Sequence, residues 1–311
     1  MTKVQNKVSK KSHWRTFMKN KELLVLTLPA LIFFFVFHYM PMGGVWMAFT
    51  NYRFVDGIFG SEFVGLRWFR VFLQGDLTRV MRNTLGYSFT FIIVGVVAGV
   101  FTAIMMNAVR KKMAVKVYQT IMILPHFMSW IVIALILYVF LDPLYGVVNR
   151  ALINFGFAPV MWYARPQYWP FILTFVNIWQ SVGMGSLIYY AALMGIDPTL
   201  YESAALDGAG KIAKFKFITL PSLVPLITIL TLLSLSGLFR GDFGLFFAVP
   251  RDIGALYPAT DVLDTYIYRG LRQGLLSLNA AAGLIQSILG FIAVVSVNFI
   301  VKKISPENAL F

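Results

Sequence analysis

Long apolar stretches alternate with shorter polar segments along most of the chain. Six of these stretches hold no Asp, Glu, Lys or Arg away from their ends. Most are longer than the roughly 20 residues that an α-helix needs to cross the hydrocarbon core of a bilayer. The pattern therefore predicts an all-α, polytopic membrane protein with about six transmembrane helices, at residues 23–50, 84–108, 115–141, 169–196, 222–239 and 281–301.

The composition agrees with a membrane protein. Of 311 residues, 59% are hydrophobic and 13% are charged, whereas soluble proteins carry about 25% charged residues. The length suits one transmembrane domain at residues 23–301, between a basic N-terminal segment (1–22) and a short tail (302–311). The absence of cysteine from the sequence excludes disulfides, thiolate chemistry and zinc–thiolate sites.

The basic residues predict the orientation in the membrane. Seven Lys or Arg lie within residues 1–21, and no cleavage pattern follows, so we expect an uncleaved anchor with a cytoplasmic N-terminus. Six crossings then place the C-terminus and the segment 197–221 in the cytoplasm as well. The net charge of +14 does not indicate a nucleic-acid partner, because the basic residues adjoin apolar spans, where membrane lipid is the expected partner.

The segment 197–221 is a polar interruption between the fourth and fifth spans. Asp197 can cap a helix that Pro198 opens, because proline at the first helical position loses only a donor that has no partner there. Helical spacing places Tyr201 on one face with three small residues, so another backbone could approach that face closely. We expect a helix, a turn and a second short helix outside the bilayer. The small residues are Ala204, Ala205 and Gly208, and Gly208 and Gly210 are expected to end or bend the first helix.

Part of this segment resembles a known motif. The matching residues are Glu202, Ala204, Gly208, Ile218, Leu220 and Pro221. Their spacing is similar to that of the EAA loop in permease subunits of binding-protein-dependent ABC importers, with Ser203 in place of the first alanine. In that family the loop is the coupling helix, which seats in a cleft of the ATPase subunit. The resemblance implies this role for Tyr201, Glu202, Ser203, Ala204, Ala205, Leu206, Asp207, Gly208, Ala209 and Gly210.

Other fragments resemble the sugar-transporting branch of this family. Residues 39–44 and 261–266 look like the branch that imports complex oligosaccharides and polysaccharide fragments. The resemblance implies a carbohydrate permease that works by alternating access in the bacterial cytoplasmic membrane. The implied partners are a second, similar permease subunit, two copies of an ATPase subunit and an extracytoplasmic solute-binding protein. ATP and Mg would be bound by the ATPase subunits, and this chain would have no cofactor, no metal and no catalytic site.

Three alternative functions stay open: an ABC permease for a non-sugar solute, an ion-coupled secondary carrier, and a membrane scaffold or sensor that needs no transport pathway. Ion-coupled carriers usually keep charged residues inside their spans, and these spans hold no Asp, Glu, Lys or Arg away from their ends. A nucleotide site is not predicted, because Ala205 stands where a phosphate-binding loop needs its first glycine and Ile212 replaces the Mg-binding Ser or Thr. A metal cluster is not predicted either, given the spacing of His13, His38 and His126.

The fourth span carries the best candidates for lining a transport pathway. Polar side chains in hydrocarbon need a partner or water, so some of them must face the interior of the bundle. We predict that Asn177, Gln180 and Tyr190 line the pathway, and we expect Gly183 and Gly185 to loosen the helix between them. The same residue types form interhelical hydrogen bonds, so sugar binding and helix packing both stay open as their role.

Overall fold

The computed structural model describes residues 21–109 and 111–304. The predicted basic N-terminal segment and C-terminal tail lie almost entirely outside the described residues. The long helices are α2 (Lys21–Phe34), α5 (Leu77–Asn107), α6 (Lys112–Ile123), α7 (Trp130–Leu141), α9 (Trp169–Met194), α12 (Leu220–Leu235) and α16 (Leu276–Ile304). Shorter helices are α3 (Gly57–Gly60), α4 (Arg67–Gln74), α8 (Val147–Asn154), α10 (Pro198–Leu206), α11 (Lys211–Lys214), α13 (Phe243–Ala248), α14 (Tyr257–Thr260) and α15 (Leu263–Arg272). One antiparallel ribbon pairs β1 (Thr50–Asn51) with β2 (Glu62–Phe63).

The described residues confirm an all-α architecture with about six spans. Five segments are long and apolar enough to cross a membrane, and the bent pair Lys112–Phe127 and Trp130–Leu141 brings the number to six if it is one span. Three predicted starts are wrong: α5 begins at Leu77 instead of residue 84, α16 at Leu276 instead of residue 281, and the fifth helical segment at Lys211 instead of residue 222. All three segments continue through polar turns that lie beyond their apolar stretches. The second short helix expected outside the bilayer is therefore wrong as a separate element, because α11 runs through a π-helical turn into α12. The five continuous segments are Val25–Phe49, Leu77–Asn107, Pro166–Met194, Lys211–Leu235 and Leu276–Lys303.

The third predicted span, residues 115–141, is not one straight helix. α6 and the 3-10 turn that follows it meet α7 at an angle of 100°. Pro125 lies in this turn, and it lacks the backbone N–H that would continue the α-helical hydrogen bonds. The helix restarts at Ser129, whose Oγ accepts a hydrogen bond from the N–H of Val132 (3.4 Å). The proline thus breaks a span that the apolar pattern alone shows as continuous.

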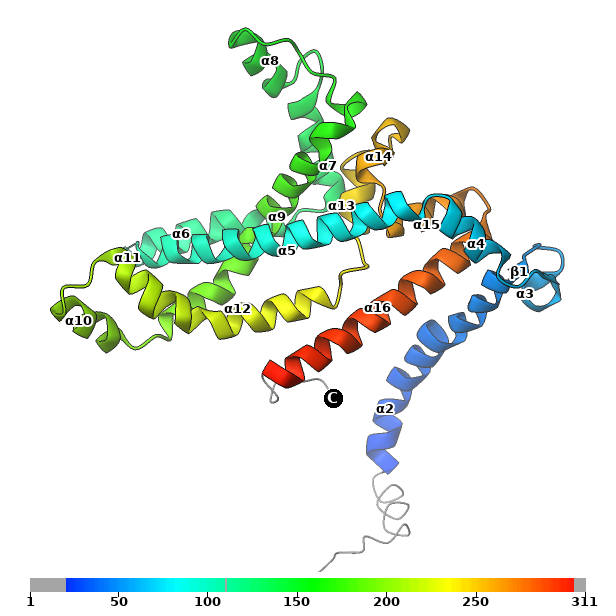
Figure 1. Cartoon of the computed structure of the whole chain (residues 1–311), viewed down its shortest axis with the longest axis horizontal. Coiled ribbons are helices and arrows are strands. Elements are labelled where there is room, and N and C mark those ends of the chain that lie inside the picture. The colour runs from blue at the N-terminus through cyan, green and yellow to red at the C-terminus, as the bar shows by residue number, and fades with distance from the viewer. Residues whose placement is uncertain (1–20, 110, 305–311) are drawn as a thin grey trace, which may run out of the picture.

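α5 and α9 form the centre of the bundle, with α6 and α12 beside them (Figure 1). At the start of α9, Trp169 and Leu173 pack in a buried cluster with Tyr87 of α5 and Phe246 of α13. At the other end of α9, Leu193 packs in a second cluster with residues of α5 and α12. α9 therefore connects the end of the bundle covered by α13 to the end where α10 lies.

Gly183 allows a close contact between α9 and α6. A Cβ atom on Gly183 would overlap the backbone carbonyl of Met122 on α6, whereas at Gly185 the corresponding position has nothing within 4 Å. α9 runs without a break from Trp169 to Met194. The expectation that these glycines loosen the helix is therefore wrong, and Gly183 instead serves close packing between helices.

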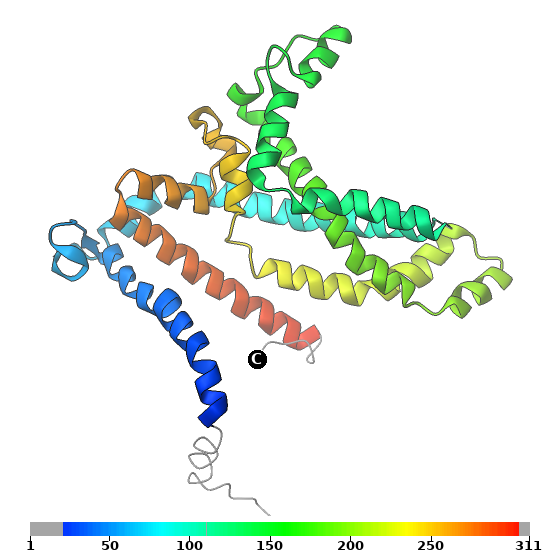
Figure 2. The same ribbon diagram turned by 180° about the vertical axis from the view of Figure 1, so that it is seen from behind.

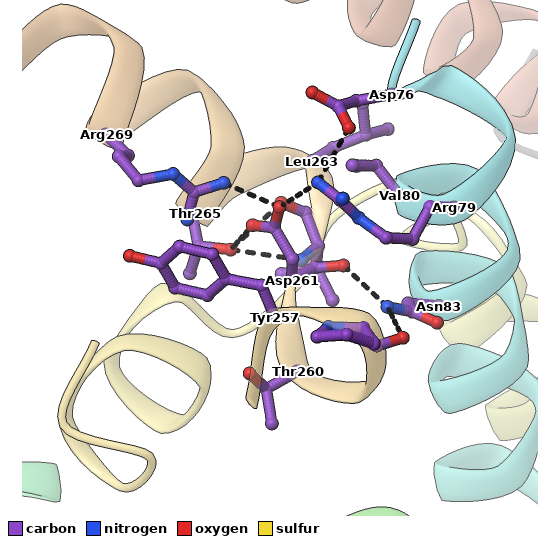
Figure 3. Close-up of polar contacts among 12 residues, drawn as sticks. Asp76, Arg79, Val80, Asn83, Tyr257, Thr260, Asp261, Leu263, Thr265 and Arg269 are labelled. Atoms are coloured by element: carbon purple, nitrogen blue, oxygen red, sulfur yellow. Dashed lines mark hydrogen bonds and ion pairs between the residues drawn. The ribbon is translucent and has the colours of Figure 1, made fainter. Parts of the chain in front are cut away.

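Asp261 is the centre of a polar cluster at the end of the bundle where α5 begins (Figure 3). Its carboxylate is fully buried, and its Oδ2 accepts hydrogen bonds from Arg79 of α5 (3.1 Å) and Arg269 of α15 (2.6 Å). Its Oδ1 accepts a hydrogen bond from the hydroxyl of Thr265 (3.0 Å), and its backbone carbonyl accepts one from Nδ2 of Asn83 (3.0 Å). The cluster therefore ties α5 to α15 and to the link between α14 and α15.

The first span is attached to the rest of the chain through its second half. Its 3-10 segment Met40–Phe49 packs beside α16, and the N–H of Tyr52 just beyond it donates a hydrogen bond to Oγ of Ser277 (2.8 Å). In both views α2 diverges from the other helices (Figures 1 and 2). The most apolar part of this span is 0% buried, against 22% for α5. The first span therefore buries little surface within this chain.

Replacing Asp261 with alanine is expected to lower the free energy of unfolding by about 3 kcal/mol, because the change leaves two arginines without their buried partner. The matched control is Asp76→Ala, since Asp76 pairs with Arg79 at 2.9 Å but its side chain is 44% exposed. An exposed pair of this kind contributes about 1 kcal/mol or less. Thermal unfolding in detergent micelles compares the two variants, and equal stability would contradict the central role of Asp261.

Gly183→Ala is expected to destabilise the chain by about 1–3 kcal/mol, because the added methyl group overpacks the contact between α6 and α9. Gly185→Ala adds the same group where space is free, so it should behave as the unsubstituted chain. The yield of monodisperse protein after size-exclusion chromatography, with heat challenge, measures the effect. A Gly183→Ala variant as heat-resistant as the Gly185→Ala control would show that the two helices separate without cost.

Candidate functional site

α10 begins as the sequence predicts. Oδ1 of Asp197 accepts a hydrogen bond from the N–H of Thr199 (2.9 Å), and Pro198 occupies the first helical position. The hydrogen bond from this backbone N–H favours the carboxylate form and lowers the pKa of the Asp197 carboxyl below its usual value. Only three residues separate Met194, the end of α9, from Pro198. α10 therefore follows the membrane helix α9 over a short link.

α10 ends in a Schellman turn at Gly208. The N–H of Gly208 donates to the carbonyl of Ala205 (3.1 Å), and the N–H of Ala209 donates to the carbonyl of Ala204 (2.8 Å). Gly208 has a φ of 77°, in the left-handed region that disfavours side chains. The prediction that Gly208 ends the helix is confirmed. The prediction that it extends the small-residue face of the helix is wrong, because it belongs to the terminating turn.

The small-residue face of α10 is divided between the chain and solvent. Tyr201 and Ala204 are half-buried, while Ala205 is exposed. The hydroxyl of Tyr201 lies 2.9 Å from the hydroxyl of Thr219, at hydrogen-bonding distance, in the π-helical turn Phe215–Thr219 that leads into α12. α10 is thus joined to α9 through the short link and to α12 through this hydrogen bond.

Two large apolar side chains project from the segment that the motif predicts to be the docking site. Leu206 is 90% exposed and Ile212 is 83% exposed. Ile212 lies in α11, just beyond the predicted docking residues. An apolar side chain between two lysines in a polar segment is the sequence feature that could have identified Ile212 as part of the docking surface. The remaining predicted docking residues Glu202, Ser203, Asp207 and Gly210 are exposed, and Ala209 is half-buried.

Two hollows follow one another along α5 and α9 and share Ile178. The first has a volume of about 930 Å³ and lies between the first halves of both helices and α14, with Arg82 as the charged residue of its lining. The second has a volume of about 550 Å³, and α12 forms its third wall. The walls are mainly apolar, with hydroxyl and amide side chains from Asn83, Thr90, Gln167 and Thr174 in the first hollow and Ser181, Tyr189 and Ser234 in the second.

The predicted pathway residues lie on α9 beside these hollows. Asn177, Gln180 and Tyr190 are half-buried, and none of them lines either hollow of the described chain. Nε2 of Gln180 donates a hydrogen bond to the carbonyl oxygen of His126 (3.4 Å), at the bend between α6 and α7. Gln180 therefore satisfies backbone that the broken span leaves without a regular partner. Contact of the three residues with a substrate stays a prediction.

The sequence is similar to known transport proteins over nearly its whole length. The family described as binding-protein-dependent transport system inner membrane component matches residues 95–306, which include the segment 197–221. Protein LplB of Bacillus subtilis (strain 168) is 31% identical over 298 residues, which are 95% of this chain and 93% of LplB. The polygalacturonan/rhamnogalacturonan transport system permease protein YteP of the same organism is 31% identical over 297 residues, which are 94% of this chain and 91% of YteP.

A solved structure has the same fold. It is the crystal structure of a bacterial ABC transporter involved in the import of the acidic polysaccharide alginate, and its matching chain is 32% identical with a TM-score of 0.84. The match covers 94% of this chain and 99% of that chain. The resemblance drawn from the EAA spacing is thereby confirmed at the level of the family. This chain belongs to the inner membrane components of binding-protein-dependent transport systems.

Proposed function

We propose that this chain is the permease subunit of an ATP-driven ABC importer that carries an oligosaccharide or polysaccharide fragment across the bacterial cytoplasmic membrane. The observation that carries the proposal is the family match over residues 95–306, together with the exposed segment in which the coupling motif stands. YteP is named for polygalacturonan and rhamnogalacturonan transport, and the transporter of similar structure for import of alginate. These relatives support a complex carbohydrate as the substrate.

The geometry of α10 supports a direct mechanism of coupling. α10 follows α9 after three residues, and the Tyr201–Thr219 contact joins it to the turn that leads into α12. α9 and α12 are two of the three walls of the 550 Å³ hollow. A displacement of α10 by closing ATPase subunits would therefore move two walls of the hollow together. ATP biases the inward-facing and outward-facing states only through contacts that differ between them, and α10 is where these contacts are made.

The chain itself contributes docking surface and leaves ATP hydrolysis to its partners. Ile212 stands where a phosphate-binding loop needs a hydroxyl, so the sequence around it does not form a nucleotide site. ATP and Mg would instead be bound by two ATPase subunits. Ile212 and Leu206 are instead exposed apolar side chains suited to burial in a cleft of the ATPase, and Glu202 on α10 is exposed as well. The cytoplasm is then on the α10 side of the membrane, together with both termini.

The shape of the single chain supports a second permease subunit. The two hollows are open along the α5–α9 pair, and the first span is 0% buried in its most apolar part. A similar subunit that covers these surfaces would close the pathway from the other side. An extracytoplasmic solute-binding protein would deliver the sugar at the α15 end, opposite to α10. One transporter of similar structure has been crystallised with an alginate pentasaccharide-bound periplasmic protein.

Uptake into vesicles tests the proposed function. Vesicles that contain this chain, its partner permease and the ATPase subunits are expected to accumulate a radiolabelled oligosaccharide only when ATP and the loaded binding protein are both present. A protonophore should leave the uptake unchanged when ATP is held constant, because the spans hold no Asp, Glu, Lys or Arg away from their ends. Loss of uptake on collapse of the ion gradient would replace the ABC importer by an ion-coupled carrier.

Gly208→Trp is expected to abolish co-purification of the ATPase subunits, because the indole ring would occupy the docking surface next to Leu206. A Cβ atom at Gly208 has nothing within 4 Å, so it meets no other part of this chain, but the φ of 77° strains the backbone under any side chain there. The matched control is Gly208→Asn, since asparagine tolerates the left-handed backbone and adds little bulk. Normal ATPase binding and transport in Gly208→Trp would contradict docking at this turn, and loss in both variants would assign the effect to the backbone.

A further inference from the structure

Residues 142–168 connect α7 to α9 and stand out from the bundle, with α8 at their tip, at the end of α9 opposite to α10 (Figures 1 and 2). We call them the α8 platform. Seven of their large apolar side chains are strongly exposed, with exposed fractions between 52% and 80%. They are Leu144, Tyr145, Val147, Ile153, Phe155, Phe157 and Met161. An exposed apolar surface of this kind marks a site of contact with another protein or with the membrane.

Asn149 gives the α8 platform a fixed shape. Its side chain is 0% exposed, and its Nδ2 donates hydrogen bonds to the carbonyls of Pro143 (3.1 Å) and Val160 (3.0 Å). Its Oδ1 accepts hydrogen bonds from the N–H of Val160 (3.1 Å) and from Nε1 of Trp162 (3.0 Å). One buried amide thus joins both arms of the segment. The apolar side chains are displayed on a preformed support.

The charges of the α8 platform are basic. Arg150 and Arg165 are exposed, and neither takes part in an ion pair found within the described part of the chain. Asp142 is the only acidic residue of the segment. Its Oδ1 accepts hydrogen bonds from the N–H groups of Leu144 (2.9 Å) and Tyr145 (2.7 Å). The carboxylate is therefore occupied by its own backbone, and both guanidinium groups stay available to an anion.

We propose that the α8 platform lies in the headgroup region of the leaflet opposite to α10 and binds anionic phospholipid there. The exposed apolar stripe of α7 leads directly into it, through Ile131 (67%), Leu135 (58%) and Val139 (63%). A stripe on a membrane helix faces lipid, so the continuous surface beyond it meets the interface of the same leaflet. Aromatic side chains favour this depth, and arginines near it are attracted to lipid phosphates.

Lipid is a better cover for this surface than the solute-binding protein. A protein that docks from the aqueous phase would have to bury apolar side chains that continue along the exposed side of α7, where Ile131 and Leu135 also border a hollow with Arg251 and Asp252. The interface also accepts the amphipathic rings of Trp162 and Tyr168, which contact each other at the base of the α8 platform (5.3 Å between ring centroids). The α8 platform would fix the tilt of α7 and the depth of the start of α9 in the bilayer.

Spin labels on single cysteines test the depth of the α8 platform, and the cysteine-free sequence makes this chain suited to the method. Phe155→Cys and Phe157→Cys carry the label in the assembled transporter, reconstituted in vesicles that contain phosphatidylglycerol. The control is Phe54→Cys, since Phe54 is 88% exposed on the same side of the membrane and lies next to the Arg53–Asp56 ion pair (3.6 Å), which belongs in water.

The labels at positions 155 and 157 are expected to collide more often with oxygen than with a water-soluble nickel chelate, and the label at position 54 should show the reverse. Added solute-binding protein should change neither value at positions 155 and 157. Equal nickel accessibility at positions 54, 155 and 157 would overturn the proposal. So would protection of positions 155 and 157 by the solute-binding protein, which would assign the surface to that protein.

A second comparison tests the anionic lipid. In the Phe155→Cys background, the double substitution Arg150→Gln and Arg165→Gln is expected to raise the accessibility of the label to the nickel chelate in phosphatidylglycerol vesicles. The raised accessibility should equal that of the unsubstituted background in vesicles of phosphatidylcholine alone. The matched control, Arg67→Gln with Arg70→Gln, removes the same charge from exposed positions of α4 on the same side and should cause no shift. An equal depth with and without phosphatidylglycerol would refute binding of anionic lipid.

Discussion

One buried carboxylate holds together the end of the bundle where the first of the two hollows lies. Asp261 forms ion pairs with two arginines, one from α5 and one from α15. The two helices therefore cannot separate without leaving an unpaired charge in a buried site. The neighbouring carbonyl of Pro258 accepts hydrogen bonds from Arg82 (3.0 Å) and Asn83 (3.2 Å), which holds α14 at the first hollow. This end of the first hollow is therefore held by ion pairs and hydrogen bonds from α5, α14 and α15.

At the opposite end, α10 is joined closely to two membrane helices. A helix of nine residues, stiffened by a charged cap at its start and a Schellman turn at its end, is joined to two membrane helices by a short link and a hydroxyl pair. A longer or more flexible connection would absorb a push from a partner as local bending. In the proposed coupling, a rigid-body shift of α10 would reach the hollow that α9 and α12 line, while the Asp261 cluster would hold the start of α5 to α15.

The sequence predicts the features that depend on local chemistry, and it misses those that depend on where two segments meet. The spans, the Asp197 cap and the helix end at Gly208 follow from apolar length, capping and backbone preference alone. The bend at Pro125 is different, because a proline in an apolar stretch is compatible with a kink or a full break, and packing decides between them. Nothing in the sequence distinguishes Gly183 from Gly185. Only the backbone of Met122, which lies against Gly183 in the structure, shows which glycine is needed for packing. The role of Asn149 likewise cannot be predicted from the sequence, because it depends on the fold bringing Pro143 and Val160 from the two sides of the α8 platform to its side chain.

The attachment of the first span at one end has a consequence for assembly. The Tyr52–Ser277 hydrogen bond and the 3-10 segment anchor it near α16, while α2 is left to be covered by whatever lies beside it in the membrane. Under the proposed pairing of two permeases, the same surface passes from lipid to protein contact when the subunits associate. The stability of this part of the chain is then a matter of mass action, and it rises with the density of the partner in the bilayer.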